Sequence, residues 1–264
     1  MMDYTKQEFM AITTGREIKD GELIILGVGL SMLAGYFAQT NHAPNMRPFT
    51  EGGVYGATPV GGLPWGIECN RISANATSFT NAIDALGFLV LSGRADNAVI
   101  GAAQVDKYGN VNTTGIWDDP PWKAGKYLPP RVRLNGSGGA ADISVGCKRY
   151  LIMVSHEKRR FVEKVDYISS TGFLNGGDSR EKCGFIGGGP AAIISTLGIL
   201  RPDPQTKEFF LDAFFPFTTI EEVKASTEWD LKISPDVNTV PEPTDEELEN
   251  LRAVDVTGSL RKKG

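Results

Sequence analysis

The stretch that decides the fold is Leu23 to Leu33, which reads LIILGVGLSML. Its first four residues form a short, continuous apolar run, which is typical of a strand buried on both faces. Gly27-Val28-Gly29 then predicts a tight turn, and an apolar helix is expected from Leu30 to Gln39. A buried strand that passes through a glycine turn into a helix is the opening unit of an α/β sheet.

The same pattern recurs along the chain. Upstream, residues 5–19 suit an amphipathic helix that ends at Asp20-Gly21. Thr219 followed by Glu222 predicts a capping box that opens a short helix through Lys224. The other expected elements are a helix over 82–91, buried strands over 98–103, 150–154, 191–195 and 208–211, and a turn at Leu197-Gly198. We therefore predict an open α/β fold with a mainly parallel sheet and helices on both faces.

Two segments depart from this pattern. Residues 110–131 contain Asp118-Asp119-Pro120-Pro121 and Pro129-Pro130, and so many prolines predict a long surface loop. Residues 235–243 are predicted to be a polar linker, followed by a helix capped by Thr244 with Glu247 and by the basic tail Arg261-Lys262-Lys263. The main domain is accordingly expected to span 1–234, and the linker, short helix and tail to span 235–264.

Composition narrows the class of protein. The net charge is −5 with no long basic run, so nucleic acid is not an expected partner. Any positive field for an anionic ligand must be local or come from another chain. Two histidines, without a metal-ligand spacing, predict no metal site. The three cysteines form no CxxC pair and are expected to be reduced thiols, and they are Cys69, Cys147 and Cys183.

The apolar stretches do not predict a membrane protein. The longest, such as residues 23–33, are too short and too rich in glycine to span a bilayer. The first nine residues, MMDYTKQEF, carry charges and lack the apolar core of a signal peptide. We therefore expect a soluble protein in the cytoplasm.

Glu51 is the first candidate for chemistry. It stands in Phe49-Thr50-Glu51-Gly52-Gly53, and the two glycines allow unusual backbone angles and the close approach of a bulky substrate. A glutamate at the end of a strand is a sensible nucleophile. Spacing alone also fits a solvated loop glutamate.

A second candidate is the glycine-rich turn Gly136-Ser137-Gly138-Gly139, between a predicted strand over 131–134 and a helical stretch. Such a turn presents backbone N–H groups that bind anions and developing oxyanions. The plainer interpretation is a tight turn without a ligand. Other motifs are missing, since no GxGxxG, GxxxxGK[ST] or GxSxG pattern is completed.

Two further segments have more than one interpretation. Gln104 to Asn112, QVDKYGNVN, predicts a hairpin or a corner between a strand and a loop. His156 to Phe161, HEKRRF, places three consecutive cations after a buried strand. These cations suit a solvated face, or a site that attracts anionic phosphates or fixes a partner chain.

Taken together, these segments resemble the class I coenzyme A transferase family, and within it the β-type subunit of the glutaconate branch. The resemblance runs from Asp3 to about Leu231 and rests on many short motifs in one order. They are DYT at 3–5, GVGL at 27–30, AP at 43–44, Glu51 with its glycines, GAQVDKYGNVN at 101–112, GSGGA at 136–140, HEKRRF at 156–161 and VDY at 165–167.

The resemblance implies a fold, a partner and a mechanism. Residues 1–234 would be a β-type domain that pairs with an α-type subunit, with the active site between the two. Glu51 would attack an acyl-CoA and carry CoA as a glutamyl thioester before passing it to a carboxylic acid. Gly138 and Gly139, with Gly136 and Ser137, would offer N–H groups to the oxyanion or to CoA, and Gly52, Gly53 and Gln104 would belong to the pocket. CoA would be a substrate, with no permanently bound cofactor.

Some features depart from the family. The glutaconate enzymes have serine, and other relatives asparagine, where this chain has Gly52, and residues 53–68 do not match closely. The loop from Trp117 to Tyr127 is longer than in the glutaconate enzyme. Together with Trp65 and Tyr55, its aromatic residues would suit a pocket wall for a larger acyl group, or else ordinary core or interface packing.

Three other functions are compatible with parts of the pattern. One sub-branch of the family hydrolyses a carbon–carbon bond in ring-containing acyl-CoA intermediates, and Glu51 would serve it as a base. Another decarboxylates a glutaconyl-type CoA ester and has cysteine in place of the glutamate, so Glu51 argues against it. A noncatalytic scaffold subunit is disfavoured by Glu51 together with the intact glycine turn.

Overall fold

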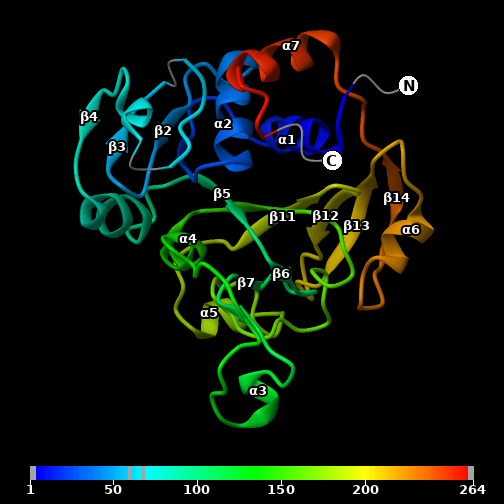
Figure 1. Ribbon diagram of the computed structural model, residues 1–264. Helices are drawn as coiled ribbons and strands as arrows, with labels where there is room; N and C mark the ends of the chain where they lie inside the picture. The colour runs from blue at the N-terminus through cyan, green and yellow to red at the C-terminus, as the bar shows by residue number, and fades with distance from the viewer. Residues whose placement is uncertain (1–3, 59–60, 67–68, 261–264) are drawn as a thin grey trace.

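A single ten-stranded sheet organises the protein (Figure 1). The computed structural model describes residues 4–58, 61–66 and 69–260, so Asp3 and the tail Arg261-Lys262-Lys263 lie outside it. In sheet order the strands are β14 (Ile233–Thr239), β13 (Phe209–Phe214), β12 (Gly198–Pro202), β11 (Pro190–Ser195), β10 (Tyr150–Val154), β5 (Asn97–Gly101), β1 (Leu23–Leu26), β2 (Arg47–Phe49), β3 (Val54–Tyr55) and β4 (Ser78–Phe79).

The centre of the sheet is parallel and its flanks are mixed. β11, β10, β5, β1 and β2 run parallel to one another, whereas β3, β4 and β12 are joined by antiparallel pairings. Two small hairpins lie outside the sheet, formed by β6 (Gln104–Val105) with β7 (Val111–Asn112) and by β8 (Gly115–Ile116) with β9 (Val132–Arg133). The predicted hairpin over 104–112 is confirmed.

Side-chain alternation along the central strands divides the core into two layers. Ile24 and Leu26 of β1 belong to one buried cluster, and Leu23 and Ile25 to the other. The first cluster packs under three helices, α1 (Lys6–Arg16), α2 (Leu30–Asn41) and α7 (Asp245–Val254), on one face of the sheet (Figure 1). The opposite face carries the hairpins and shorter helices, so the prediction of an α/β sheet covered on both faces is confirmed.

Local sequence fixes where several helices begin. Thr5, Thr219 and Thr244 each cap a helix, and in all three the glutamate three residues later completes the capping box. The shorter helices are α3 (Pro121–Ala124), α4 (Ala140–Gly146), α5 (Ser179–Lys182), α6 (Ile220–Ala225), the 3₁₀-helix η1 (Asn70–Ser73) and the π-helix η2 (Ile83–Val90). The predicted helix over 82–91 is therefore present, with π rather than α geometry.

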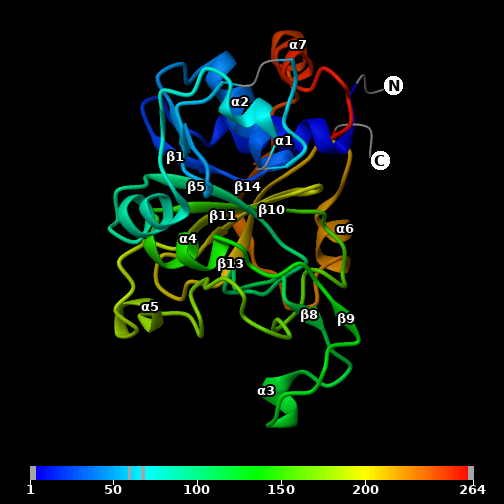
Figure 2. The same ribbon diagram turned by 60° about the vertical axis from the view of Figure 1, so that its left-hand side comes forward.

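Three sequence predictions are wrong in part. Residues 235–239, predicted as linker, belong to edge strand β14, where Pro235 is tolerated because an edge strand has an unpaired side. The stretch 198–202 is strand β12, although only a turn was expected at its start. The predicted loop over 110–131 contains β7, β8 and α3, and Figure 2 shows α3 at the tip of an arm that projects from the body. Its proline starts the helix, because the first helical residue needs no N–H partner.

The segment after the sheet packs onto the rest of the chain. Arg16 of α1 forms an ion pair with Glu247 of α7 at 2.5 Å, and Arg252 of α7 pairs with Glu8 of α1 at 2.9 Å. Within the described ranges, no helix has the length and apolar character needed to cross a membrane.

Candidate active site

Glu51 stands at the tip of the turn that joins β2 to β3. The N–H of Gly53 donates to the carbonyl of Thr50 at 3.0 Å, which closes the turn and leaves Glu51 half-buried. Gly53 has φ of +86°, and a Cβ there would lie 2.6 Å from the Thr80 carbonyl, so this turn requires glycine. The turn follows the carboxyl end of a parallel strand, where open α/β sheets bind their ligands.

The glycine-rich turn meets this glutamate. Residues 136–139 link β9 to α4, and the N–H of Gly139 donates to Oε2 of Glu51 at 2.9 Å. A Cβ on Gly139 would lie only 2.5 Å from the same oxygen. The two sequence candidates, 88 residues apart, therefore form one site. The contact needs an approach that only glycine permits.

The other N–H groups of this turn point to a role beyond turn formation. Gly136 N–H donates to the Thr113 carbonyl, and Gly136 and Gly138 have φ of +93° and +51°. The N–H groups of Ser137 and Gly138 have no acceptor among the described residues. Both residues line the cavity beside Glu51. The turn thus offers two unsatisfied donors next to the carboxylate.

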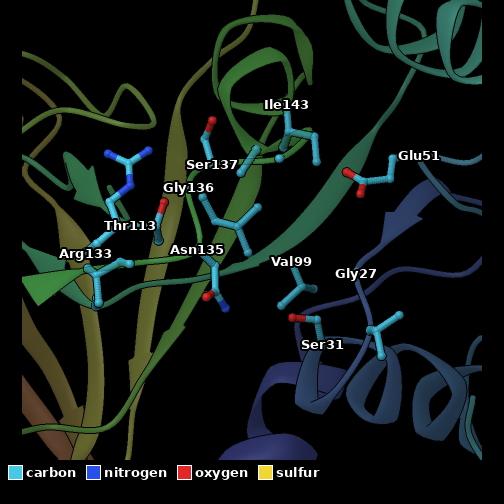
Figure 3. Close-up of a pocket in the computed structure, with 17 residues that line it drawn as sticks. Gly27, Ser31, Glu51, Val99, Thr113, Arg133, Asn135, Gly136, Ser137 and Ile143 are labelled. Atoms are coloured by element: carbon cyan, nitrogen blue, oxygen red, sulfur yellow. The ribbon is translucent and has the colours of Figure 1, made fainter. Parts of the chain in front are cut away.

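The cavity beside Glu51 has a volume of about 650 Å³ (Figure 3). A smaller cavity of about 260 Å³ also reaches Glu51 and shares Gly27, Val28 and Ile143 with the first. The lining combines apolar walls with a few polar groups, as is usual for small-molecule sites. The larger cavity is lined by Gly27, Val28, Ser31, Glu51, Val99, Ile100, Gly101, Ala103, Thr113, Arg133, Leu134, Asn135, Gly136, Ser137, Gly138, Ala140 and Ile143.

Several of these residues were not among the sequence candidates. Gly27 and Val28 were predicted only as part of a turn between a strand and a helix and of the GVGL motif, and no pattern singled out Ser31 or Asn135. Thr113 presents a buried hydroxyl that has no hydrogen-bond partner within the described chain. The sequence held two signals that could have indicated these residues. Gly27 and Val28 follow the carboxyl end of a predicted buried strand, and Asn135 directly precedes the glycine turn.

Other predicted pocket residues lie elsewhere. Gln104 is buried, and its Oε1 accepts from Asn112 Nδ2 at 2.7 Å, so it braces the β6–β7 hairpin. Gly53 lines a separate apolar cavity of about 490 Å³ together with Tyr55 and Phe88. Gly52 is exposed, beside Glu51.

The aromatic residues Trp117 and Trp122 hold the arm together and attach it to the segment around Val165. Trp117 is buried, and its Nε1 donates to the Leu128 carbonyl at 2.5 Å. Trp122 donates to the Val165 carbonyl at 3.0 Å while its ring receives the Lys164 ammonium at 4.2 Å. Trp65 is exposed, next to Gly66 of the smaller Glu51 cavity.

His156 is a buried anchor for the charged run that follows it. Its ring stacks on Phe161, with centroids 3.6 Å apart, and its nitrogens contact Ser195 Oγ at 2.9 Å and Thr227 Oγ1 at 3.0 Å. Burial lowers the pKa of His156 to about 3, so the ring is neutral at pH 7. Of the three cations beyond it, Arg159 and Arg160 both pair with Glu157.

Nothing in the described part of the chain forms a group of three or more His, Cys, Asp or Glu side chains suited to a metal ion. The three described cysteines are free thiols. Burial raises the pKa of the Cys147 thiol to about 12, which makes it unreactive as a nucleophile. What the site itself presents is a carboxylate that faces backbone N–H donors.

A carboxylate at the end of a central parallel strand, opposite an N–H-rich turn, defines a site suited to acyl transfer. The family model for coenzyme A transferase matches residues 8–226. The chain belongs to the coenzyme A transferase family, and it is an enzyme subunit of that type.

Individual relatives agree with this assignment. The chain is 35% identical over 255 residues to the B subunit of the 3-oxoadipate CoA-transferase of Pseudomonas knackmussii, covering 97% of this chain and 95% of that one. It is 35% identical over 237 residues to the B subunit of the glutaconate CoA-transferase of Acidaminococcus fermentans, covering 88% and 85%. The crystal structure of that glutaconate coenzyme A-transferase matches with a TM-score of 0.89 and 31% identity over 99% of each chain.

A more distant relative has another activity. The cholesterol ring-cleaving hydrolase IpdB subunit of Rhodococcus jostii is 26% identical over 175 residues, which cover 66% of this chain and 65% of that one.

Proposed function

We propose that this chain is the catalytic β-type subunit of a CoA-transferase that moves CoA between an acyl-CoA and a carboxylic acid through a thioester on Glu51. The observation that carries the proposal is the contact between Gly139 N–H and Glu51 Oε2 at 2.9 Å, at the edge of a cavity of about 650 Å³. It holds one carboxylate oxygen in place and leaves Oε1 to act as the nucleophile.

The proposed reaction conserves atoms and charge at each step. Glu51 Oε1 attacks the thioester carbonyl of acyl-CoA, the C–S bond breaks, and CoA leaves as a thiolate with a mixed anhydride on the enzyme. The thiolate then attacks the glutamyl carbonyl of the anhydride and releases the original acyl group as a carboxylate. An incoming carboxylate reverses both steps, so no general base and no net proton transfer are needed.

Each addition passes through a tetrahedral oxyanion, and the glycine turn supplies suitable donors. The unsatisfied N–H groups of Ser137 and Gly138 line the same cavity as Glu51. Preorganised donors of this kind are each worth about 2.7–4 kcal/mol of transition-state stabilisation.

We infer that an α-type subunit completes the site, in a heterodimer or a dimer of heterodimers. The support is an exposed apolar surface close to Glu51 (the η2 surface: Phe79, Ile83, Phe88 and Leu91). Ile83 and Phe88 lie one π-helical turn apart, and both are more than half exposed. Exposed apolar clusters of this kind mark protein interfaces. The three free thiols also favour a reducing compartment, so we infer a cytoplasmic enzyme.

The test is to trap the intermediate. The complex is incubated with acyl-CoA in the absence of an acceptor acid, and the peptide spanning Thr50 to Trp65 is examined by mass spectrometry. We expect a CoA adduct on Glu51, conversion to a hydroxamate with hydroxylamine, and ping-pong kinetics.

The hydrolase is the second candidate, because a ring-cleaving hydrolase subunit is among the relatives. In that reaction Glu51 acts as a base toward water or substrate. It predicts no CoA adduct, sequential kinetics, and turnover without an acceptor acid. Finding these three properties together would replace the transferase proposal.

A further inference from the structure

A second, positively charged cavity adjoins the Glu51 cavity. It has a volume of about 280 Å³, and its charged lining consists of Arg131, Arg159 and Arg160. Ala103 and Leu134 line both cavities, which makes the two spaces neighbours. The arginine cavity, as we call it, lies outside the set of residues assigned above to the chemistry.

Arg133 leads from one cavity toward the other. It lines the Glu51 cavity and is exposed. Figure 3 shows it across the cavity from Glu51. It belongs to β9, and Arg131 stands two residues earlier, immediately before the strand. Cationic side chains therefore continue away from the nucleophile rather than surround it.

The backbone segments that carry these arginines are fixed by contacts with the rest of the chain. The loop over 157–161 is fixed at one end by buried His156, which stacks on Phe161. It is fixed at the other by β-type hydrogen bonds, since Val105 N–H donates to the Arg160 carbonyl at 2.7 Å. The opposite wall is the β8–β9 hairpin, which carries Arg131.

The terminal nitrogens of two arginines remain available. Arg159 and Arg131 contact Glu157 and Asp118 through Nε, at 2.6 Å and 2.9 Å. Their terminal nitrogens have no partner among the residues that the structure describes. Glu157 pairs with both Arg159 and Arg160, so one carboxylate balances the charge of two guanidinium groups. The hydrogen bonds from these arginines keep the pKa of Glu157 below its usual range. The cavity keeps a positive excess in a chain whose net charge is −5.

We propose that the arginine cavity binds phosphate groups of the CoA moiety of the substrate. This inference rests on the proposed function. CoA carries its thioester at one end and its phosphates at the other, joined by a long uncharged arm, so an anion site must be offset from Glu51. Guanidinium groups with free terminal nitrogens are well suited to phosphate oxygens. An acidic surface of the partner subunit is the competing occupant, and the experiment separates the two.

The experiment uses the assembled complex and three thioesters of the same acyl group. They are the CoA ester, the 3′-dephospho-CoA ester and the pantetheine ester, which has no phosphate. The test variant is Arg131→Gln with Arg159→Gln, whose side chains are 59% and 75% exposed, so folding should be unaffected. Arg47→Gln is the matched control, because Arg47 is 54% exposed and lies at the start of β2, away from Glu51.

We expect the double variant to lower kcat/KM for the CoA ester by about 10-fold or more, through KM, with the pantetheine ester unchanged within about 2-fold. Arg47→Gln should leave all three esters unchanged. If the double variant lowers kcat/KM less for the 3′-dephospho-CoA ester than for the CoA ester, the arginines contact the 3′-phosphate. If it lowers kcat/KM equally for both, they contact the diphosphate.

Two results would overturn the inference. One is an equal fall in kcat/KM of the double variant for the CoA ester and the pantetheine ester. The other is weaker assembly of the subunits in size-exclusion chromatography, which would mean that the arginines bind the partner subunit. The Glu51 adduct remains the separate readout of the proposed function. An adduct that forms in wild type, with arginine variants that keep their preference for the CoA ester, would reject only the phosphate site.

Discussion

The two oxygens of Glu51 have different surroundings. Oε2 accepts the Gly139 N–H, whereas Oε1 has no hydrogen-bond partner in the described part of the chain. Glu51→Gln keeps the size of the side chain and removes the nucleophile, so we expect transfer to fall by roughly 10³-fold or more and the CoA adduct to disappear. Glu51→Asp keeps the charge but withdraws it by one methylene, and we expect a loss of about 100-fold. Steady-state transfer assays and peptide mass spectrometry give both results, with circular dichroism as the check on folding. Full transfer by Glu51→Gln would remove Glu51 from the mechanism.

Gly139 provides a second prediction at the scale of one residue. In Gly139→Ala the new Cβ would lie 2.5 Å from Glu51 Oε2 and 3.1 Å from Leu86, so the carboxylate must move. We expect kcat to fall by about 100-fold or more, because a misplacement of the nucleophile by about 1 Å can cost that much. Gly52→Ala is the contrast, since its nearest atom is 3.8 Å away, and we expect a change of less than about 3-fold. Thermal melts compare the two folds, and a Gly139→Ala enzyme with normal kcat would show that the turn is only structural.

At the scale of elements, the sequence is most informative where one segment decides its own structure. The capping boxes at Thr219 and Thr244 and the buried run Leu23–Leu26 depend on neighbours within a few residues, and these were predicted, whereas the capping box at Thr5 was not. β14 was missed because it is a largely exposed edge strand with Pro235 inside it, so no continuous apolar run marks it in the sequence. The meeting of Glu51 with Gly139 was available only through the family resemblance, because a contact across 88 residues leaves no local signal.

The buried His156, which anchors the loop over 157–161, makes the stability of the protein depend on pH. The pKa of His156 in the folded protein is about 3, which lies below the value of about 6.5 for a histidine in an unfolded chain. Its contribution to stability is therefore fully present above about pH 6.5 and is lost as the pH falls toward 3, because only the unfolded chain takes up the proton. Between pH 6 and 4 this adds about 1.4 kcal/mol per pH unit to the slope of the unfolding free energy.

His156→Gln should remove that part of the slope, measured by urea unfolding at pH 4, 5, 6 and 7. His42→Gln is the matched control, because His42 is the other histidine of the chain and is exposed. We expect it to leave the slope as in wild type. Equal slopes for His156→Gln and wild type would mean that the buried ring takes up its proton in the folded state.

At the scale of the whole molecule, the fold gathers its functional groups at one open edge. Glu51 follows β2, Gly27 follows β1, and the glycine turn opens α4, so three separate segments converge beside the carboxyl ends of the central strands. The face of the sheet under α1, α2 and α7 is tightly packed, and it contributes Ser31 of α2 and Val99 of β5 to the wall of the cavity. The η2 surface lies next to the site instead, which leaves the chain with reactive groups and exposed apolar residues on the same side.

From that arrangement we predict that the single chain is inactive until a partner subunit covers the site and the η2 surface. The purified single chain should show no transfer, and adding the α-type subunit should restore it together with co-elution in size-exclusion chromatography. Phe88 is 58% exposed and lines an open apolar cavity of about 490 Å³, so Phe88→Asp should abolish co-elution while the melting temperature of the single chain stays close to wild type. Val256→Asp is the matched control, because Val256 is 63% exposed and follows α7, on the covered face of the sheet. Full turnover by the single chain would contradict the shared site, whereas normal pairing by Phe88→Asp would move the interface away from η2.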